Sequence, residues 1–305
     1  MLSACATTVD RDHRELLRHG TAAFPVGCYH DDLHQADVIW HWHEELEAGL
    51  VAQGSALVTI GSRTEHLRTG DAFFINTGVL HAARPGQAGP CRLHSLVFHP
   101  RLVGGSPESV FYQDYLLPLT ARPEQQNLVL RAEAPGCGPV AAAIEAAWQA
   151  CAQEPPHFVF AVRAALSDLV ALLHDDLARA PAAGIDRRAL RDAERIKAML
   201  GCIHSRYAEP LTVADIARSA ALSPSECLRC FRRTVGRTPT RYLRDVRLRQ
   251  AVALLAGTGM PVAEVAARCG FDDVSYFTRT FRAQRQLTPT AFRQASRAGT
   301  GETAP

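Results

Sequence analysis

A duplication in the C-terminal third of the sequence constrains the fold most strongly. The segment that starts at Thr212, TVADIARSAALSPSECLRCFRRTVGRTPTRYLR, aligns with the segment that starts at Pro261, PVAEVAARCGFDDVSYFTRTFRAQRQLTPTAFR. The offset between the two copies is 49 residues at first and 50 after one added residue, which pairs Arg229 with Arg279. We therefore expect two copies of one structural unit.

The first copy predicts two short helices separated by a tight turn. Thr212 and Asp215 form the start of a capping box, and the stretch SAALS interrupts the helical pattern. Ser223 then caps a second helix, with Pro224 at its first position and Glu226 three residues after the cap. A short helix, a sharp turn and a second helix form a helix-turn-helix unit, whose second helix enters the major groove of DNA.

The second copy predicts the same arrangement, with Gly270 in the turn and Asp272 as the cap of the second helix. Residues 240–256, between the copies, contain neither glycine nor proline. They predict a connecting helix of about 26 Å. Such a spacer suits two recognition helices that enter successive major grooves about 34 Å apart.

The two parts of the chain differ in charge. Residues 1–185 contain 12 arginines and 20 acidic residues, a net charge of −8, whereas residues 211–297 contain 15 arginines and 6 acidic residues, a net charge of +9. A basic segment favours nucleic acid as a partner. For each arginine taken singly, a solvated helical face is the alternative explanation.

The duplicated segment resembles the DNA-binding domain of the AraC/XylS family of transcription regulators. The resemblance covers residues 212–294 and is most specific in RCGFDDVSYFTRTFRAQRQLTPTAFR. Ala221 and Gln286 stand where the family often has glycine, and Leu228 stands where an outward residue is usually polar. The resemblance implies an all-α domain of two helix-turn-helix units joined by a long helix, with double-stranded DNA and RNA polymerase as partners.

The resemblance also assigns DNA contacts to both recognition helices. Arg229 and Arg279 can form bidentate hydrogen bonds with guanine, while apolar side chains can contact thymine methyl groups. Arg232, Arg233 and Arg282 fit phosphate contacts better. The expected DNA-binding residues are Ser223, Ser225, Leu228, Arg229, Arg232, Arg233, Val274, Ser275, Tyr276, Thr278, Arg279 and Arg282.

A second candidate site lies near the N-terminus. Residues 30–100 contain short alternating runs broken by glycine, which is typical of a small antiparallel β-barrel. His41, His43 and Glu47 share parity, so they point to the same face of an extended strand. His81 has to come from a facing strand.

The spacing of these residues resembles the two cupin motifs, H-x-H-x3-E-x6-G and a later segment that ends in G-x2-H. Asn76 stands where the second motif usually has proline, and Pro85 where it usually has asparagine. In metal-binding cupins the matching residues bind Fe, Mn, Ni or Zn, and three imidazoles with one carboxylate suit such a metal. The resemblance therefore implies a divalent metal held by His41, His43, Glu47 and His81. The alternative is an effector pocket that the same side chains line without metal.

We interpret the pocket as a sensor, because a reaction needs groups beyond metal ligands and the sequence identifies neither a base nor a substrate clamp. The expected function is therefore that of a DNA-binding transcription regulator controlled by a small-molecule effector, and not that of an enzyme. The alternative is a cupin metalloenzyme, a dioxygenase or an isomerase, with an appended DNA-binding module.

The middle of the chain predicts helices. Within residues 157–180, apolar side chains recur at helical spacing: Val159, Val162, Leu166, Leu169, Val170 and Leu173. One face is expected to pack on the barrel. The family resemblance assigns such helices to a homodimer, and a core within one chain is the alternative.

Taken together, the patterns predict an α+β fold. We expect a disordered leader over residues 1–20, a cupin domain with C-terminal helices over 21–180, a linker over 181–190, the tandem helix-turn-helix domain over 191–297 and a tail over 298–305.

The nine cysteines are scattered along the chain, which favours reduced thiols. The closely spaced Cys227 and Cys230 are expected in the core. No run of eighteen apolar residues occurs, so we expect no membrane span and a cytoplasmic protein.

Overall fold

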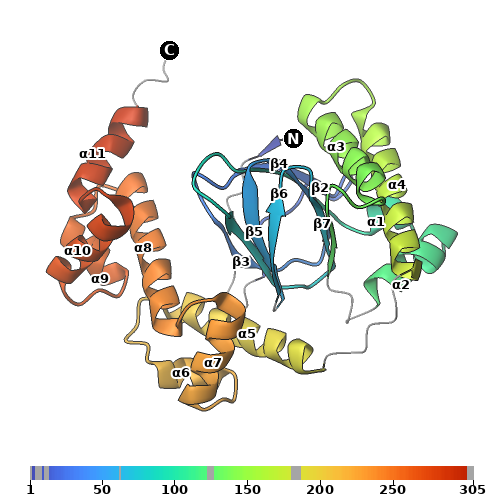
Figure 1. Cartoon of the computed structure of the whole chain (residues 1–305). Coiled ribbons are helices and arrows are strands. Elements are labelled where there is room, and N and C mark those ends of the chain that lie inside the picture. Colours follow the sequence, from blue (N-terminus) through green and yellow to red (C-terminus); the bar gives the residue numbers. More distant parts are fainter. Residues whose placement is uncertain are drawn as a thin grey trace. The chain divides into compact units, whose positions relative to one another are not determined.

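The structure is a computed structural model that describes residues 2–3, 9, 14–61, 63–121, 127–179 and 187–300 (Figure 1). The chain divides into two compact units, Met1–Glu194 and Arg195–Pro305. Residues 181–186 of the expected linker and 301–305 of the expected tail lie outside the described residues, whereas residues 187–190 and 298–300 belong to helices and correct those two bounds. The predicted α+β class is confirmed: the first unit contains two β-sheets and the second contains helices.

Two sheets form the barrel of the first unit. The larger sheet has the order β1-β2-β9-β4-β7-β10, with bounds Leu2–Ser3, Val26–Asp32, Arg92–Phe98, Leu46–Gln53, Ala72–Ile75 and Asn127–Leu130. The smaller sheet has the order β3-β8-β5-β6, with bounds Val38–His41, His81–Pro85, Ser55–Ile60 and Arg63–Arg68. The described strands pair antiparallel, apart from β1, which runs parallel to β2.

Alternation along the larger sheet separates two cores. Leu46 and Ala48 of β4 belong to the core that includes the helices, whereas Val51 of the same strand packs in the core between the sheets. Successive side chains of a strand point to opposite faces. Glu47, between Leu46 and Ala48, therefore faces the interior of the barrel, next to Ile75 of β7.

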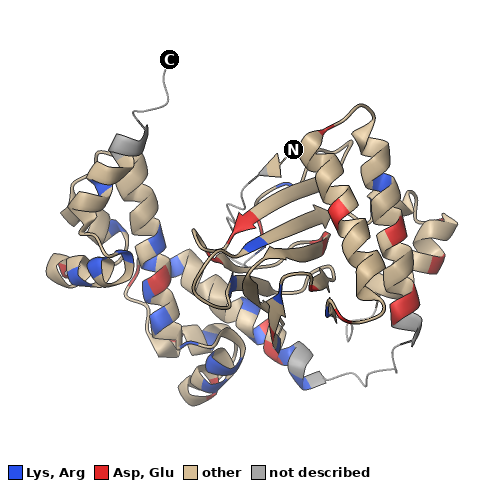
Figure 2. Cartoon of the chain, turned by 45° about the horizontal axis from the view of Figure 1, so that its top comes forward, with Lys and Arg blue, Asp and Glu red and all other residues tan. Residues whose placement is uncertain are grey.

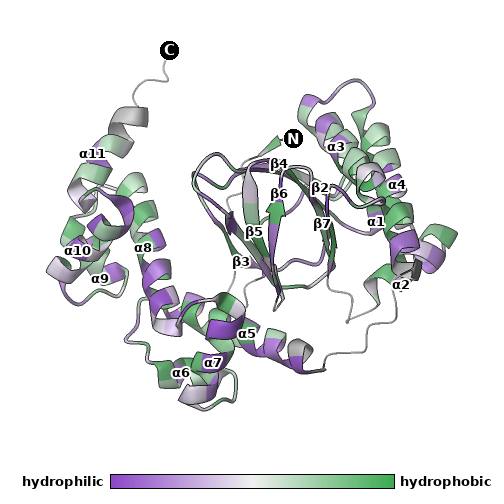
Figure 3. Cartoon of the chain, viewed as in Figure 1, coloured by the Kyte–Doolittle hydropathy of each residue, from purple (hydrophilic) through white to green (hydrophobic). Residues whose placement is uncertain are grey.

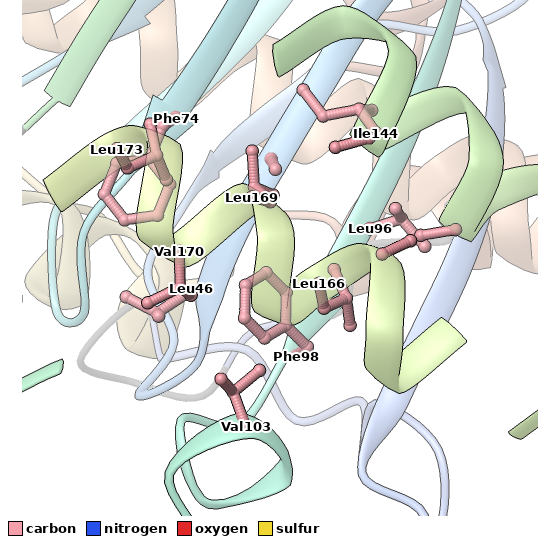
Figure 4. Close-up of a cluster of buried hydrophobic side chains, with 14 of the residues drawn as sticks. Leu46, Phe74, Leu96, Phe98, Val103, Ile144, Leu166, Leu169, Val170 and Leu173 are labelled. Carbon is pink, nitrogen blue, oxygen red and sulfur yellow. The ribbon is translucent and has the colours of Figure 1, made fainter. Parts of the chain in front are cut away.

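Helices α3 (Cys137–Gln153) and α4 (Phe158–Arg179) cover the outer face of the larger sheet. Figure 4 shows the apolar side chains of α4 against side chains of the strands, among them Leu46, Phe74 and Phe98. The apolar face predicted for α4 is confirmed at Val162, Leu166, Leu169, Val170 and Leu173. Val159 is an exception, because 36% of it is exposed. The segment between the sheet and α3 contains α1 (Arg101–Gly104), η1 (Phe111–Leu116) and α2 (Leu117–Thr120).

The second unit is built from consecutive helices around a long central helix. Their bounds are Arg187–Arg206 for α5, whose start precedes the unit, Val213–Ser219 for α6, Pro224–Val235 for α7, Pro239–Gly257 for α8, Val262–Arg268 for α9, Val274–Arg285 for α10 and Pro289–Thr300 for α11. The predicted connecting helix over 240–256 is confirmed as α8. No helix among the described residues is long and apolar enough to span a membrane.

The helix starts agree with the sequence in the first copy and differ by one residue in the second. Both predicted capping boxes of the first copy are present, at Thr212 and at Ser223. In the second copy the cap of α10 is Asp273 and not Asp272. The reason is that the Asp273 backbone is extended and its carboxylate accepts a hydrogen bond from Tyr276 N at 2.9 Å.

Left-handed backbone occurs at two equivalent positions of each copy. Gly270 (φ +76°) matches Ala221 (φ 54°), and Gly236 (φ 72°) matches Gln286 (φ 60°). Each copy therefore has glycine at one of the two positions. Gly270 is also sterically required, since a Cβ there would lie 2.8 Å from the carbonyl oxygen of Tyr207.

Arg247 of α8 holds the central helix to the segment that follows α5. Its Nε and Nη2 donate hydrogen bonds to the carbonyl oxygens of Tyr207 and Glu209, each at 2.7 Å. Its guanidinium also lies over the ring of Phe271. In the sequence this arginine is one of the 15 of the basic segment, and no local pattern predicts its structural role.

We predict that Gln286→Gly raises the free energy of unfolding by about 1 kcal/mol, because glycine adopts left-handed backbone without the steric cost that a Cβ imposes. Denaturant titration measures the change. Gly236→Ala is the matched control: a Cβ there would meet nothing within 4 Å, so it isolates the backbone cost and should lower stability. Equal stability of the three proteins would contradict the prediction.

We also predict that Arg247→Ala lowers the free energy of unfolding by about 2 kcal/mol, since it removes hydrogen bonds made by a charged group. The exposed Arg232 of α7 provides the comparison, and Arg232→Ala should change stability by about 0.5 kcal/mol or less. Thermal unfolding of both variants tests this assignment. A similar loss in both would show that Arg247 carries no special structural role.

Candidate functional site

Four side chains meet inside the barrel. His41 ends β3, His43 follows it, Glu47 lies on β4 of the other sheet and His81 begins β8. Each side chain offers one ligand atom, and these atoms all lie within 4.8 Å of one another. All four residues are buried. The structure thus brings together the four residues that the cupin-like spacing singled out.

Strand pairing explains how the set assembles. His41 and His81 are direct partners across β3 and β8, and their ring centroids lie 4.1 Å apart. Glu47 approaches from the facing sheet: its Oε2 lies 2.9 Å from His81 Nε2 and 3.3 Å from His43 Nε2. We call these four residues the histidine quartet.

Backbone carbonyls orient the three imidazoles of the quartet. Nδ1 of His41 lies 2.8 Å from the carbonyl oxygen of Ile39, and Nδ1 of His81 lies 2.8 Å from that of Val79. Nδ1 of His43 lies 3.1 Å from the carbonyl oxygen of Glu45. A carbonyl oxygen only accepts, so each Nδ1 carries the hydrogen and donates it. The Nε2 atoms then face the cavity, as in histidines that bind metals.

The charges of the quartet are coupled. Burial opposes ionisation of Glu47, but the positive charge and hydrogen bonds of His81 and His43 outweigh it and hold the pKa of Glu47 well below its usual value. Burial also acts against protonated His81, yet the Glu47 carboxylate raises the pKa of this histidine. Burial and the neighbouring histidines hold the pKa of His41 well below its usual value, so that His41 is neutral.

The donor set fits a divalent metal ion. His81 Nε2 and His43 Nε2 are both buried and lie 2.9 and 3.3 Å from Glu47 Oε2. With the nearby His41, their ligand atoms are gathered in one small region of the barrel. Three imidazole nitrogens and one carboxylate oxygen are ligands that zinc, iron, manganese and nickel accept.

Two further residues enter the same pocket from the N-terminal segment. Glu15 N donates a hydrogen bond to Trp42 O at 2.8 Å, and His19 Nδ1 lies 2.7 Å from Tyr29 OH. Glu15 Oε2 lies 3.1 Å from His19 Nε2 and 3.7 Å from His41 Nε2. Both residues are buried, which corrects the expectation of a disordered leader for residues 14–20. Part of the remaining leader lies outside the described residues.

Glu15 and His19 were not predicted as site residues, because they lie outside both cupin-like motifs. The available signal was their i,i+4 spacing, E-x3-H, which alone is common in exposed helices. Together with His43 they form a second group of potential ligands within 4.8 Å.

The recognition helices α7 and α10 present the second candidate site. Their inner faces bury Phe231 in the first copy, and Phe277 and Phe281 in the second. The twelve residues expected to contact DNA are exposed, apart from Leu228 and Thr278, which are half-buried. Figure 2 shows that basic residues predominate on the helices of this unit, and Figure 3 shows hydrophilic and hydrophobic segments alternating along them.

Two large side chains lie on the outer face of α10. Val274 and Tyr276, at the start of this helix, are 40% and 45% exposed, so they are accessible to a partner such as DNA.

Cys227 and Cys230 of α7 are buried as expected. Burial raises the pKa of Cys227 to about 11, so its thiol stays protonated at neutral pH and serves packing.

Comparisons with known proteins agree with this architecture. Residues 24–153 match the AraC-like ligand binding domain, and residues 216–295 match a helix-turn-helix domain family. The uncharacterized HTH-type transcriptional regulator YdeC of Bacillus subtilis is 28% identical over 289 residues, which cover 94% of this chain and 97% of YdeC. The HTH-type transcriptional activator RhaR of Yersinia pestis is 24% identical over 269 residues, which cover 85% of this chain and 86% of RhaR.

A solved structure of a transcriptional regulator with an AraC-type DNA-binding domain, from Chromobacterium violaceum, is also similar. It is 26% identical, covers 33% of this chain and 91% of its own, and has a TM-score of 0.32. The two family models together cover the barrel and the duplicated helices, and the relatives match along most of the chain. This chain therefore belongs to the AraC family of DNA-binding transcription regulators and has an AraC-like ligand-binding domain before its helix-turn-helix domain.

Proposed function

We propose that this regulator reads an operator sequence with α7 and α10 and that a small molecule in the barrel pocket controls this binding. The observation that carries the proposal is the equivalent outer faces of the two recognition helices. Arg229 and Arg279 occupy matching exposed positions, as do Arg232 and Arg282, while the phenylalanines on the opposite faces are buried.

Within each recognition helix we assign different tasks to the two arginines. Residues near the N-terminus of a recognition helix reach base edges, whereas residues further along reach the backbone. Arg229 and Arg279 are therefore assigned to guanine, and Arg232, Arg233 and Arg282 to phosphates. The exposed Val274 and Tyr276 would contact thymine methyl groups, and Ser223, Ser225, Leu228, Ser275 and Thr278 complete the contact surface.

We propose further that the histidine quartet holds one divalent metal ion. His41, His43, Glu47 and His81 would be its ligands, and the carbonyl hydrogen bonds to the three Nδ1 atoms keep the Nε2 atoms available. A bound metal would supply a Lewis-acidic centre in the barrel. The chain itself contributes the orientation of the ligands and the exclusion of water from a buried site.

The quartet also favours a second candidate function, that of a metalloenzyme in the barrel. We favour a sensor, because the relatives along most of the chain are transcription regulators. Turnover of a candidate substrate by the purified full-length protein, abolished by His81→Ala, would support the enzyme instead.

We propose that the protein is a homodimer in the cytoplasm. We also propose that it contacts RNA polymerase. The apolar face of α4 is used within one chain, since Leu166, Leu169 and Leu173 pack on the larger sheet. A dimer contact would therefore use other residues of α4. Phe160, which is 71% exposed, is the strongest candidate. Light scattering of the wild type and of Phe160→Ser measures the assembly, and a monomeric wild type would contradict the proposal.

We predict that Arg279→Ala weakens operator binding by about 1 to 3 kcal/mol and relaxes the base preference at one position, whereas binding to random DNA changes little. Arg282→Ala, one turn further along the same helix, should weaken binding to both DNAs alike and reduce the salt dependence by about one unit of log–log slope. The operator is first selected from random fragments by the purified protein, and affinities are then measured at several salt concentrations. Equal losses on both DNAs for Arg279→Ala would exclude its base-reading role.

We predict about one equivalent of Zn, Fe, Mn or Ni in protein purified without a polyhistidine tag and without added metal. His81→Ala should lose most of this metal, because it removes a ligand from the quartet. His34→Ala is the control, since His34 is exposed and lies outside the quartet. Elemental analysis of the three proteins gives the result. A metal-free wild type that also fails to take up added zinc would reduce the quartet to a pocket lining.

A further inference from the structure

The barrel pocket has an unusual balance of charge. Its space, including the open mouth, is about 440 Å³, and three carboxylates line it, those of Glu15, Asp31 and Glu47. The lining among the described residues includes neither lysine nor arginine. The histidines are the basic groups of this lining, and His81 is already paired with Glu47. A carboxylate or phosphate effector would therefore meet like charges without a lysine or arginine partner, whereas a cation would be attracted to the carboxylates.

Buried polar atoms in this pocket have no partners, and they do not belong to the quartet. Glu15 Oε1, His19 Nε2 and Ser95 Oγ lack a hydrogen bond within the described part of the chain. The side chains of Glu15 and His19 are each 2% exposed, and Ser95 is 3% exposed. An unsatisfied buried polar group is costly, so such atoms mark the position of a ligand or of ordered water.

These three residues are linked through Tyr29. Ser95 of β9 is the direct cross-strand partner of Tyr29 on β2, and both residues line the pocket. Tyr29 OH in turn lies 2.7 Å from His19 Nδ1. When this Nδ1 carries the hydrogen, His19 Nε2 presents a lone pair next to the Glu15 carboxylate. In this tautomer a bound donor can serve both acceptors, which lie 3.1 Å apart, whereas in the other tautomer His19 Nε2 donates to Glu15 directly.

A second metal ion does not suit this position. The third ligand of the Glu15 and His19 group would be His43. A neutral imidazole whose Nδ1 hydrogen is donated to a carbonyl has one lone pair, on Nε2, and His43 Nε2 already lies 3.3 Å from Glu47 in the quartet. Glu15 and His19 alone are too few ligands for a metal site.

The rest of the pocket is apolar and suits a short hydrocarbon body. Its lining includes Val58, Phe73, Ile75, Leu93 and Val97. An ammonium group has three hydrogen-bond donors and no acceptor. Those three donors match the acceptors that Glu15 Oε1, His19 Nε2 and Ser95 Oγ offer, and the chain of an alkylamine would contact the apolar wall.

We propose that the effector of this regulator is a small organic cation, a protonated primary amine with a short apolar body, whose ammonium group binds Glu15, with His19 and Ser95 as further acceptors. The inference rests on the proposed role of the barrel as the effector site. It names the chemical class of the effector and is independent of which metal the quartet holds.

Three molecules of similar shape test the class: n-butylamine, which is protonated at neutral pH, 1-butanol and butyrate. Binding of each to the full-length protein is measured by ligand-observed NMR and calorimetry at pH 7. Butylamine should bind at least about tenfold more tightly than the alcohol or the acid, the difference expected from charge-assisted hydrogen bonding. Butyrate binding as tightly as butylamine would overturn the proposal.

Glu15→Gln is the decisive variant, because it keeps the shape of the side chain and removes its charge. It should weaken butylamine binding by about tenfold, the size of one charge-assisted hydrogen bond, and leave butanol binding unchanged. Glu44→Gln is the matched control, since Glu44 lies in the first unit and its exposed side chain pairs with Arg14. Unfolding curves establish that both variants fold. Equal amine affinity in Glu15→Gln and in the wild type would overturn the assignment.

Two further measurements separate this inference from its premises. Elemental analysis after addition of zinc should give the same metal content in Glu15→Gln and in the wild type, and loss of a second equivalent in the variant would replace the amine site by a two-metal site. Operator affinity is measured with and without butylamine. Amine binding that leaves operator affinity unchanged would contradict the effector role. Operator binding by a protein that does not bind the amine would contradict this inference and leave the proposed DNA-binding function unaffected.

Discussion

The two-sided burial of the larger sheet is the constraint on which the first unit depends. Its outer face packs against α3 and α4, and apolar side chains of these helices form one core with it. The inner face is thereby free to carry polar groups, among them Glu47, between two buried apolar neighbours of the same strand. A one-residue shift in the register of β4 would turn Glu47 into the helix-facing core. It would disrupt the apolar packing of the outer face and remove Glu47 from the inner face.

In the second unit, buried aromatic rings direct the arginines. Phe231, Phe277 and Phe281 occupy the inner faces of α7 and α10, so helical periodicity turns Arg229 and Arg279 outward. Core packing therefore sets the orientation of these arginines, and no contact of the arginine side chains themselves is needed to turn them outward. Arg247 shows the contrast: it lies in the same basic segment, yet it is held by two carbonyl oxygens of the segment that follows α5.

Local signals explain what could be predicted from the sequence. Capping boxes, helical periodicity and strand parity depend on residues a few positions apart, and they located α7, α8 and three quartet residues on one face. Contacts that depend on chain path were missed. Glu15 and His19 reach the pocket because the N-terminal segment pairs with Trp42, and no periodicity encodes that pairing. The cap at Asp273 was misplaced because Asp272 and Asp273 are equally suited by type, and backbone conformation decides between them.

The unsatisfied atoms of the pocket bear on how sensing can be coupled to DNA binding. A ligand shifts a conformational equilibrium only by the difference between its affinities for the two states. Each buried polar atom left without a partner costs about 1 to 3 kcal/mol, so a ligand that satisfies several of them gains most in the state that holds them in place. Glu15 and His19 come from the N-terminal segment, and their contribution exists only while residues 14–20 are packed on the barrel. Binding of the proposed amine and the packing of this segment would therefore stabilise each other.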